Sequence, residues 1–210
     1  MTAMQPTVVA FDVDGTLTVR DCVVPFMRRV AGPAVFGTRL VAGGVSNVRA
    51  VVRRDRDLLK ADFVRRVFEG RDVEQVRESG VRFAAEIAES WLRADVAGRL
   101  RWHQDQGHVV LLVSASLDPY LEPLGDMLEV DAVLCTTLET DGVTYSGRLV
   151  GPNCRADQKI VRIREWCTAS GVAFESLEWA YGDSSGDTAM LAAATNGVLV
   201  KGIELTQVPA

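Results

Sequence analysis

Short apolar runs that alternate with helical patterns constrain the fold of this chain most strongly. The runs fall at 8–11, 109–113, 131–135, 177–181 and 197–200. Helical patterns separate them at 95–106, 118–128, 156–169 and 187–194. Strands that alternate with helices are typical of a parallel, doubly wound sheet with right-handed crossovers. The sequence therefore predicts an α/β fold.

Two segments interrupt this alternation. Residues 18–91 contain no convincing strand but several helical stretches, so they are interpreted as a helical insertion after the first strand. Residues 1–17 and 92–210 would then form the α/β core. The second interruption contains Asp141-Gly142 between the β-rich runs 135–138 and 143–145, a pattern that predicts a β-hairpin.

Polar side chains follow the ends of several predicted strands. They are Asp12 and Asp14 after the first strand, Ser114 and Ser116 after the second, and Asp183 and Asp187 after the fourth. Parallel strands share one carboxyl edge, where α/β proteins bind their ligands. Carboxylates gathered there repel each other unless a cation is present, and oxygen ligands favour Mg²⁺. A serine hydroxyl and the ammonium group of Lys159 would suit a phosphate group. Lys159 lies near the start of the helical pattern that precedes the fourth strand.

These residues resemble the four ordered motifs of the haloacid dehalogenase (HAD) superfamily. The motifs are Asp12-Val-Asp14-Gly-Thr16, Ser114, Lys159 and the run 182–187, Gly-Asp-Ser-Ser-Gly-Asp. They extend over most of the chain in the order that the family shows. The insertion at 18–91 resembles the helical cap of the phosphoserine-phosphatase-like branch, subfamily IB. The resemblance implies a Rossmann-like core with an inserted cap.

The resemblance also implies a two-step phosphoryl transfer. Asp12 would attack phosphorus and form an aspartyl-phosphate, which divides a slow hydrolysis into two easier steps. Asp14 would protonate the leaving group and then help to deprotonate the attacking water. Ser114 and Lys159 would hold phosphoryl oxygens.

The family match further implies a Mg²⁺ site. The Asp12 carboxylate, the Asp14 backbone carbonyl and Asp183 would hold the ion, which would offset the repulsion between nucleophile and phosphate. Asp187 would support the site by orienting Lys159 or a metal-bound water rather than by ligating the ion.

Several further residues are candidates for substrate contact. Asp21 lies where phosphoserine phosphatases carry a glutamate that binds the substrate amino group, and a plain surface charge is the alternative. Arg65 and Arg66 lie where that family places an arginine that binds the substrate carboxylate, so the resemblance implies this role for one of the two. Ala115 and Ser116 replace two glycines of the usual motif and would narrow the pocket. A helix N-cap is the alternative role for Ser116.

Departures from the motif weaken phosphoserine as the specific substrate. Besides the changes after Ser114, Gly186 stands where the fourth motif often has asparagine. Phosphoserine phosphatases are therefore a guide to the chemistry of this chain more than to its substrate.

The composition of the chain argues against some classes of binding partner. The 210 residues are 48% hydrophobic and 24% charged, as in globular proteins. The net charge of −5 argues against nucleic acid as a partner. No apolar run approaches the roughly 18 residues of a membrane span. The four cysteines have no zinc-site spacing, so we expect a cytoplasmic protein with reduced thiols. The oligomeric state stays open.

The expected function is Mg²⁺-dependent hydrolysis of a small phosphorylated metabolite. Two alternatives remain at this point. A phosphotransferase would use the same aspartyl-phosphate and pass the group to an alcohol. A non-catalytic HAD-like module would bind a phosphorylated ligand or a protein.

Overall fold

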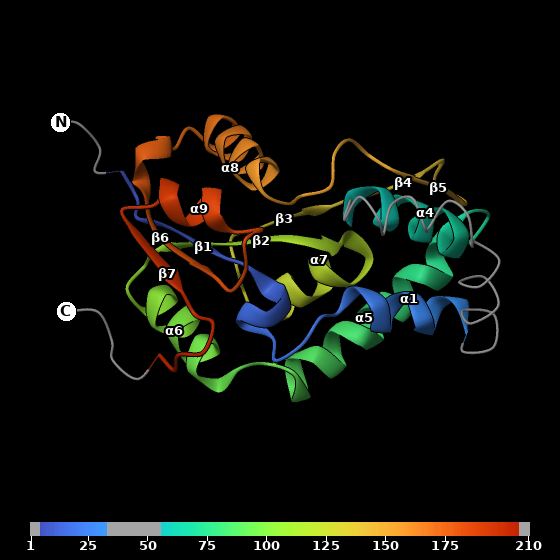
Figure 1. The fold of residues 1–210 in the computed structure, drawn as a ribbon, viewed down its shortest axis with the longest axis horizontal. Helices are drawn as coiled ribbons and strands as arrows, with labels where there is room; N and C mark the ends of the chain where they lie inside the picture. The colour runs from blue at the N-terminus through green and yellow to red at the C-terminus, as the bar shows by residue number, and fades with distance from the viewer. Residues whose placement is uncertain (1–4, 33–55, 206–210) are drawn as a thin grey trace.

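A parallel sheet forms the centre of the larger part of the molecule (Figure 1). The computed structural model describes residues 5–32 and 56–205. Within them, the sheet has the strand order β3-β2-β1-β6-β7. The strands are β1 (Val8–Phe11), β2 (Val109–Leu117), β3 (Ala132–Thr136), β6 (Leu177–Gly182) and β7 (Asn196–Leu199). All neighbouring pairs are parallel, which confirms the predicted α/β fold.

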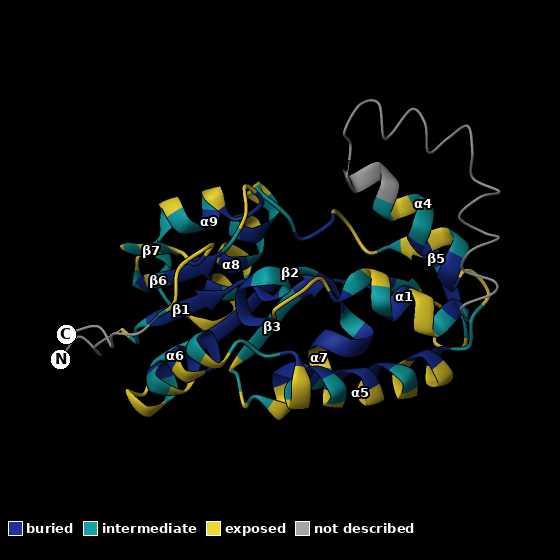
Figure 2. Ribbon diagram, turned by 60° about the horizontal axis from the view of Figure 1, so that its bottom comes forward, coloured by how far each residue is buried: buried dark blue, intermediate teal, exposed yellow. Residues whose placement is uncertain are grey.

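Different helices cover the two faces of the sheet. They are α6 (Ala94–Asp105), α7 (Asp118–Met127), α8 (Asp157–Ser170) and α9 (Thr188–Ala193). Successive strand side chains point to opposite faces. Val9 and Phe11 therefore join the core with α6 and α7, whereas Val8 and Ala10 pack with α8 and α9. Figure 2 shows the resulting buried interior. Burial on both faces explains why β1 is an uninterrupted apolar run.

A helical layer lies beside the sheet, on the right of Figure 1. It contains α1 (Val23–Ala31), α4 (Arg56–Phe68) and α5 (Val73–Ser90). Helix α5 approaches α7 so closely that a Cβ atom at Gly80 would lie 1.8 Å from the Pro119 carbonyl oxygen. Aromatic rings join the layers, with Phe26 and Phe83 centroids 4.8 and 5.3 Å from that of Tyr120. The helical layer and the sheet layer thus share one continuous core.

The predicted hairpin is present as β4 (Leu138–Thr140) and β5 (Tyr145–Leu149). Asp141 Oδ1 closes its turn by accepting hydrogen bonds from the backbone N–H groups of Val143 and Thr144. The hairpin docks on the helical layer: Gly70 N–H donates to the Tyr145 carbonyl at 2.9 Å. A segment that follows the third strand therefore packs against the helical layer.

The main difference from the predicted elements is the length of β2. The strand was expected at 109–113 but continues to Leu117, because Leu117 pairs with Thr136 of β3 beyond a register shift. Ser116 therefore lies inside the strand and does not cap α7, whose N-cap residue is Leu117. In the part of the chain that the structure describes, no helix has the length and apolar character needed to cross a membrane.

Candidate active site

The segment after β1 forms one wide turn at the carboxyl edge of the sheet. The turn covers Val13–Leu17 and is closed by the Thr18 N–H, which donates to the Val13 carbonyl at 2.9 Å. Gly15 has a φ of +82°, and a Cβ atom there would lie 2.6 Å from Asp183 Oδ2. Glycine is therefore needed both for the backbone conformation and for the close approach of Asp183.

Asp12 is held at the base of this turn. It is only 6% exposed. Its Oδ1 lies 2.6 Å from Lys159 Nζ, and its Oδ2 accepts a hydrogen bond from Thr16 Oγ1 at 3.0 Å. The Asp12 N–H donates to the Tyr181 carbonyl of the neighbouring strand β6. Side chain and backbone are both fixed, so the carboxylate has a defined direction.

Asp187 is the second carboxylate on Lys159. Its Oδ1 lies 2.6 Å from Lys159 Nζ, while its Oδ2 accepts from the N–H and hydroxyl of Ser184 at 3.0 and 2.9 Å. Gly182 makes room for it, because a Cβ atom there would lie 2.5 Å from the Asp187 Cβ. Both oxygens of Asp187 therefore have hydrogen-bond partners within the protein.

The buried charges shift each other's protonation. Burial raises the pKa of Asp12 to about 7, although the Lys159 ammonium opposes the shift. Burial works to lower the pKa of Lys159, but Asp12 and Asp187 outweigh it and raise that pKa. Burial and the neighbouring Asp187 raise the pKa of Asp183. The protein's own groups therefore leave part of this negative charge uncompensated.

This cluster fits a hard divalent cation. Asp12, Asp183 and Asp187 each offer an oxygen, and these atoms lie within 4.8 Å of one another. Carboxylate oxygens are the ligands that Mg²⁺ prefers, and a dication would offset the excess negative charge. The donor set of the described residues is thus suited to Mg²⁺.

Asp14 occupies a separate hydrogen-bonded position in the same turn. Its Oδ1 accepts from the Cys22 N–H at 2.8 Å, and its Oδ2 accepts from Ser116 Oγ at 2.6 Å. The Tyr120 hydroxyl in turn donates to Ser116 Oγ at 2.7 Å. Burial, helped by the charge of Asp21, raises the pKa of Asp14.

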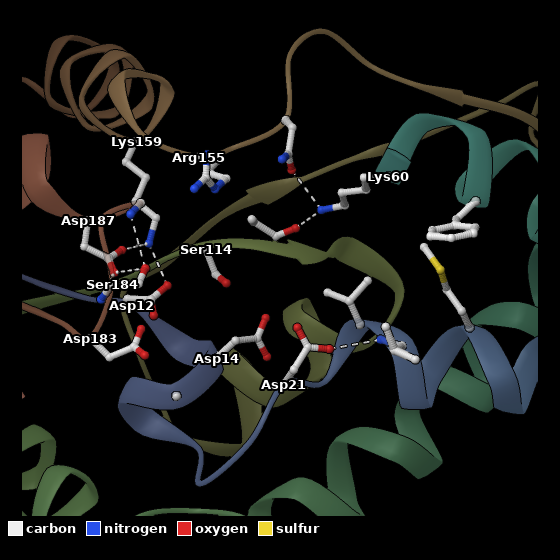
Figure 3. A pocket seen from close by; sticks show the side chains of 18 residues that line it. Asp12, Asp14, Asp21, Lys60, Ser114, Arg155, Lys159, Asp183, Ser184 and Asp187 are labelled. Carbon is white, nitrogen blue, oxygen red and sulfur yellow. Dashed lines mark hydrogen bonds and ion pairs between the residues drawn. The ribbon is translucent and has the colours of Figure 1, made fainter. Parts of the chain in front are cut away.

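A cavity of about 540 Å³ opens above these residues (Figure 3). Asp12, Asp183, Asp187 and Lys159 gather at one end of it. Its other lining residues are Asp14, Gly15, Asp21, Val23, Val24, Met27, Lys60, Phe63, Ser114, Ala115, Asn153, Arg155, Ser184 and Gly186. The cavity therefore joins the carboxyl edge of the sheet to the helical layer.

The structure brings most of the predicted site residues to this cavity, but not all. Arg65 and Arg66 do not line it, contrary to the expected substrate contact. They lie on another face of α4 and form ion pairs with Asp62. Ser116 does not line it either, because the side chain is buried against Asp14 and Tyr120. Of the other residues expected to contact the substrate, Asp21 and Ala115 do line the cavity.

Two cavity cations were not predicted from the sequence. Lys60 of α4 reaches the core side, where its Nζ donates to the Ala115 carbonyl and, at 2.8 Å, to Asn153 Oδ1. Arg155 lies four residues before Lys159. Lys60 stands at the end of an arginine-rich run that resembles an ordinary solvated helix face. Nothing in the sequence distinguishes it from its neighbours.

Comparison with known proteins identifies the family. Residues 9–192 match the family of haloacid dehalogenase-like hydrolases, so the chain belongs to that family. The chain is similar to Protein CicA of Caulobacter vibrioides, with 38% identity over 192 residues that cover 90% of this chain and 84% of the relative.

Solved structures share the fold at lower identity. A protein of unknown function from Bordetella pertussis Tohama I superposes with a TM-score of 0.76 at 20% identity, over 91% of this chain and 88% of that one. A phospho-aspartyl intermediate analogue of phosphoserine phosphatase superposes with a TM-score of 0.60 at 16% identity, over 91% and 84% of the two chains. At these identities the likeness establishes the fold.

Proposed function

We propose that this protein is a Mg²⁺-dependent phosphatase that hydrolyses a small phosphate monoester through an aspartyl-phosphate on Asp12. One observation carries the proposal. Asp12 is fixed by Lys159 at the end of a cavity that Asp14, two residues on, also faces. The family membership and the fold shared with a phosphoserine phosphatase support the same class of substrate.

In the first step, an Asp12 oxygen forms a bond to phosphorus while the bond from phosphorus to the leaving oxygen breaks. The contacts with Lys159 and Thr16 hold the carboxylate in one orientation, which lowers the entropic cost of attack. Ser114 lines the cavity, and its hydroxyl would bind a phosphoryl oxygen together with Lys159. Mg²⁺, held by Asp12, Asp183 and the Asp14 carbonyl, would offset the repulsion between nucleophile and phosphate.

Asp14 acts as the general acid and then as the general base. Its raised pKa keeps it protonated to higher pH than an ordinary aspartate, so it can donate to the leaving oxygen. In the second step, water attacks the phosphorus of the aspartyl-phosphate and gives its proton to Asp14. Inorganic phosphate leaves, and both carboxyl groups return to their starting forms.

Residues 18–91 are proposed as a cap over a core of 1–17 and 92–210; residues 33–55 of this cap lie outside the described residues. Val24, Met27 and Phe63 give the cavity an apolar wall on the helical side. Lys60 joins this layer to the core at the Ala115 carbonyl. Such a cap would exclude water until the ester is positioned and would select its leaving group.

The test is phosphate release from a panel of monoesters with Mg²⁺, including phosphoserine, histidinol phosphate, glycerol phosphates and sugar phosphates. We expect release without an added alcohol. Asp12→Asn should lower turnover by at least about 10³-fold, while Asp126→Asn, which changes an exposed carboxylate, should not. Unchanged hydrolysis by Asp12→Asn would end the proposal. Turnover only with an alcohol acceptor would make the protein a phosphotransferase.

A further inference from the structure

Arg155 is a cavity cation to which the family motifs assign no role. It lines the cavity, and Figure 3 shows its side chain on the wall between Lys159 and Lys60. Among the residues that the structure describes, its guanidinium has no hydrogen-bond or ion-pair partner. A partly buried guanidinium that faces a cavity in this way is available to a ligand.

The backbone around Arg155 is held in place from both sides. The Arg155 N–H donates to the Asn153 carbonyl at 2.7 Å, and the Ala156 N–H donates to the Gly186 carbonyl at 3.0 Å. Ala156 has a φ of +52°, a left-handed backbone conformation that alanine rarely adopts. The turn is therefore tied to the loop that carries Asp183 and Asp187.

The side chain of Arg155 packs against a glycine of that loop. A Cβ atom at Gly186 would lie 3.4 Å from Arg155 Nε and 3.3 Å from Ser184 Oγ. The distance to Arg155 Nε is that of ordinary contact, so the guanidinium lies directly against the backbone at position 186. Arg155 is thus placed beside the loop that carries Asp183 and Asp187.

The other two cavity cations are already engaged. Lys159 is shared by the carboxylates of Asp12 and Asp187, so much of its charge is compensated. The Lys60 ammonium is bonded to oxygens of Ala115 and Asn153. The transferring phosphoryl group spreads negative charge over its non-bridging oxygens, and a guanidinium matches two such oxygens geometrically. Arg155 is the cavity cation among the described residues that is free to do so.

We propose that Arg155 is a catalytic residue that binds non-bridging oxygens of the transferred phosphoryl group, beside Ser114 and Lys159. The inference rests on the proposed function. Arg155 gives up no proton: the bond from Asp12 to phosphorus forms, the bond to the leaving oxygen breaks, and Asp14 supplies the proton. The guanidinium offsets the charge of the phosphoryl oxygens throughout.

The experiment compares Arg155→Gln and Arg155→Lys with the full-length wild-type protein in Mg²⁺. The matched control is Arg164→Gln, which removes an exposed arginine of the following helix. The measurements are kcat/KM for p-nitrophenyl phosphate and the Kd of inorganic phosphate by calorimetry. Arg155→Gln should lower kcat/KM by about 10²-fold, as for the loss of one preorganised donor. It should also weaken phosphate binding by roughly tenfold. Arg155→Lys should recover part of the kcat/KM and part of the phosphate affinity. Arg164→Gln should match wild type in both measurements.

Unchanged phosphate binding in Arg155→Gln would overturn the inference, even if KM for one particular ester rises, because Arg155 would then contact the leaving group. This failure is distinct from failure of the proposed function. If wild type hydrolyses monoesters and Asp12→Asn does not, the proposed function stands whatever Arg155 does. If wild type hydrolyses none, the phosphate Kd of the Arg155 variants still decides the inference.

Discussion

Lys159 Nζ lies 2.6 Å from Asp12 Oδ1, and both side chains are almost completely removed from solvent. The same ammonium lies 2.6 Å from Asp187 Oδ1. One buried cation therefore holds the proposed nucleophile at the strand end and links it to the loop after β6. Such a group is costly to bury alone but stable when its partners are in place.

Removing the cation should destabilise the protein strongly. Lys159→Met leaves two buried carboxylates without their partner, and breaking a buried pair in this way costs about 3–5 kcal/mol. Urea unfolding of the metal-free protein measures the loss. Adding Asp187→Asn to Lys159→Met should restore part of it, since one uncompensated charge is removed. A loss below about 1 kcal/mol, the range of exposed ion pairs, would contradict the buried pairing.

Gly15 should matter for metal binding, beyond its backbone conformation. Gly15→Ala forces a Cβ atom to 2.6 Å from Asp183 Oδ2, whereas Gly70→Ala has a similar φ of +73° but meets no atom within 4 Å. Both variants should lose about 1 kcal/mol of stability from the left-handed backbone. Only Gly15→Ala should weaken Mg²⁺ binding, by roughly tenfold or more in calorimetry. Equal Mg²⁺ affinities in the two variants would refute this role of Gly15.

Lys60 should make the free energy of unfolding rise with pH in the alkaline range. Burial lowers the pKa of Lys60 from 10.5 to about 8 in the folded protein. The folded state therefore binds this proton less tightly than the unfolded chain does. The charged amine lowers the free energy of unfolding below pH 8 by up to roughly 3 kcal/mol, and the loss disappears as the pH rises from about 8 to 10.5.

The measurement is the difference in unfolding free energy between wild type and Lys60→Met across that pH range. The free energy of unfolding of the wild type should rise relative to that of Lys60→Met as the pH rises. Thr136 Oγ1 still donates to Asn153 Oδ1 in the variant, so that oxygen keeps a partner. Lys201→Met, which removes an exposed lysine, is the control. A Lys60→Met difference that stays constant with pH would show that Lys60 is not desolvated.

The sequence was sufficient to predict the sheet and the end of the cavity that holds Asp12, Lys159 and Asp183, because both depend on local patterns. Buried parallel strands are apolar runs, and the residues after them must meet at one edge. The length of β2 was missed because Ser114, Ala115 and Ser116 resemble a loop. Their strand conformation depends on the pairing of Leu117 with Thr136 of another strand.

The substrate side of the cavity was not predictable for a related reason. Which α4 side chains face the core depends on how that helix docks, and the hairpin that covers it comes from a distant part of the sequence. The docking directs Lys60 inward and leaves Arg65 and Arg66 paired with Asp62. Arg155 likewise lines the cavity beside Gly186, a residue thirty-one positions later in the chain, and this proximity is not visible in a local pattern.

The most direct test of the account is to trap the covalent intermediate on Asp12. Full-length protein is mixed with Mg²⁺ and a hydrolysed monoester, quenched in acid during turnover, digested and analysed by mass spectrometry. The account predicts one phosphoryl group on the peptide that contains Asp12, and none in Asp12→Asn. Rapid hydrolysis with no phosphoryl group on that peptide, or with the group on another residue, would contradict it.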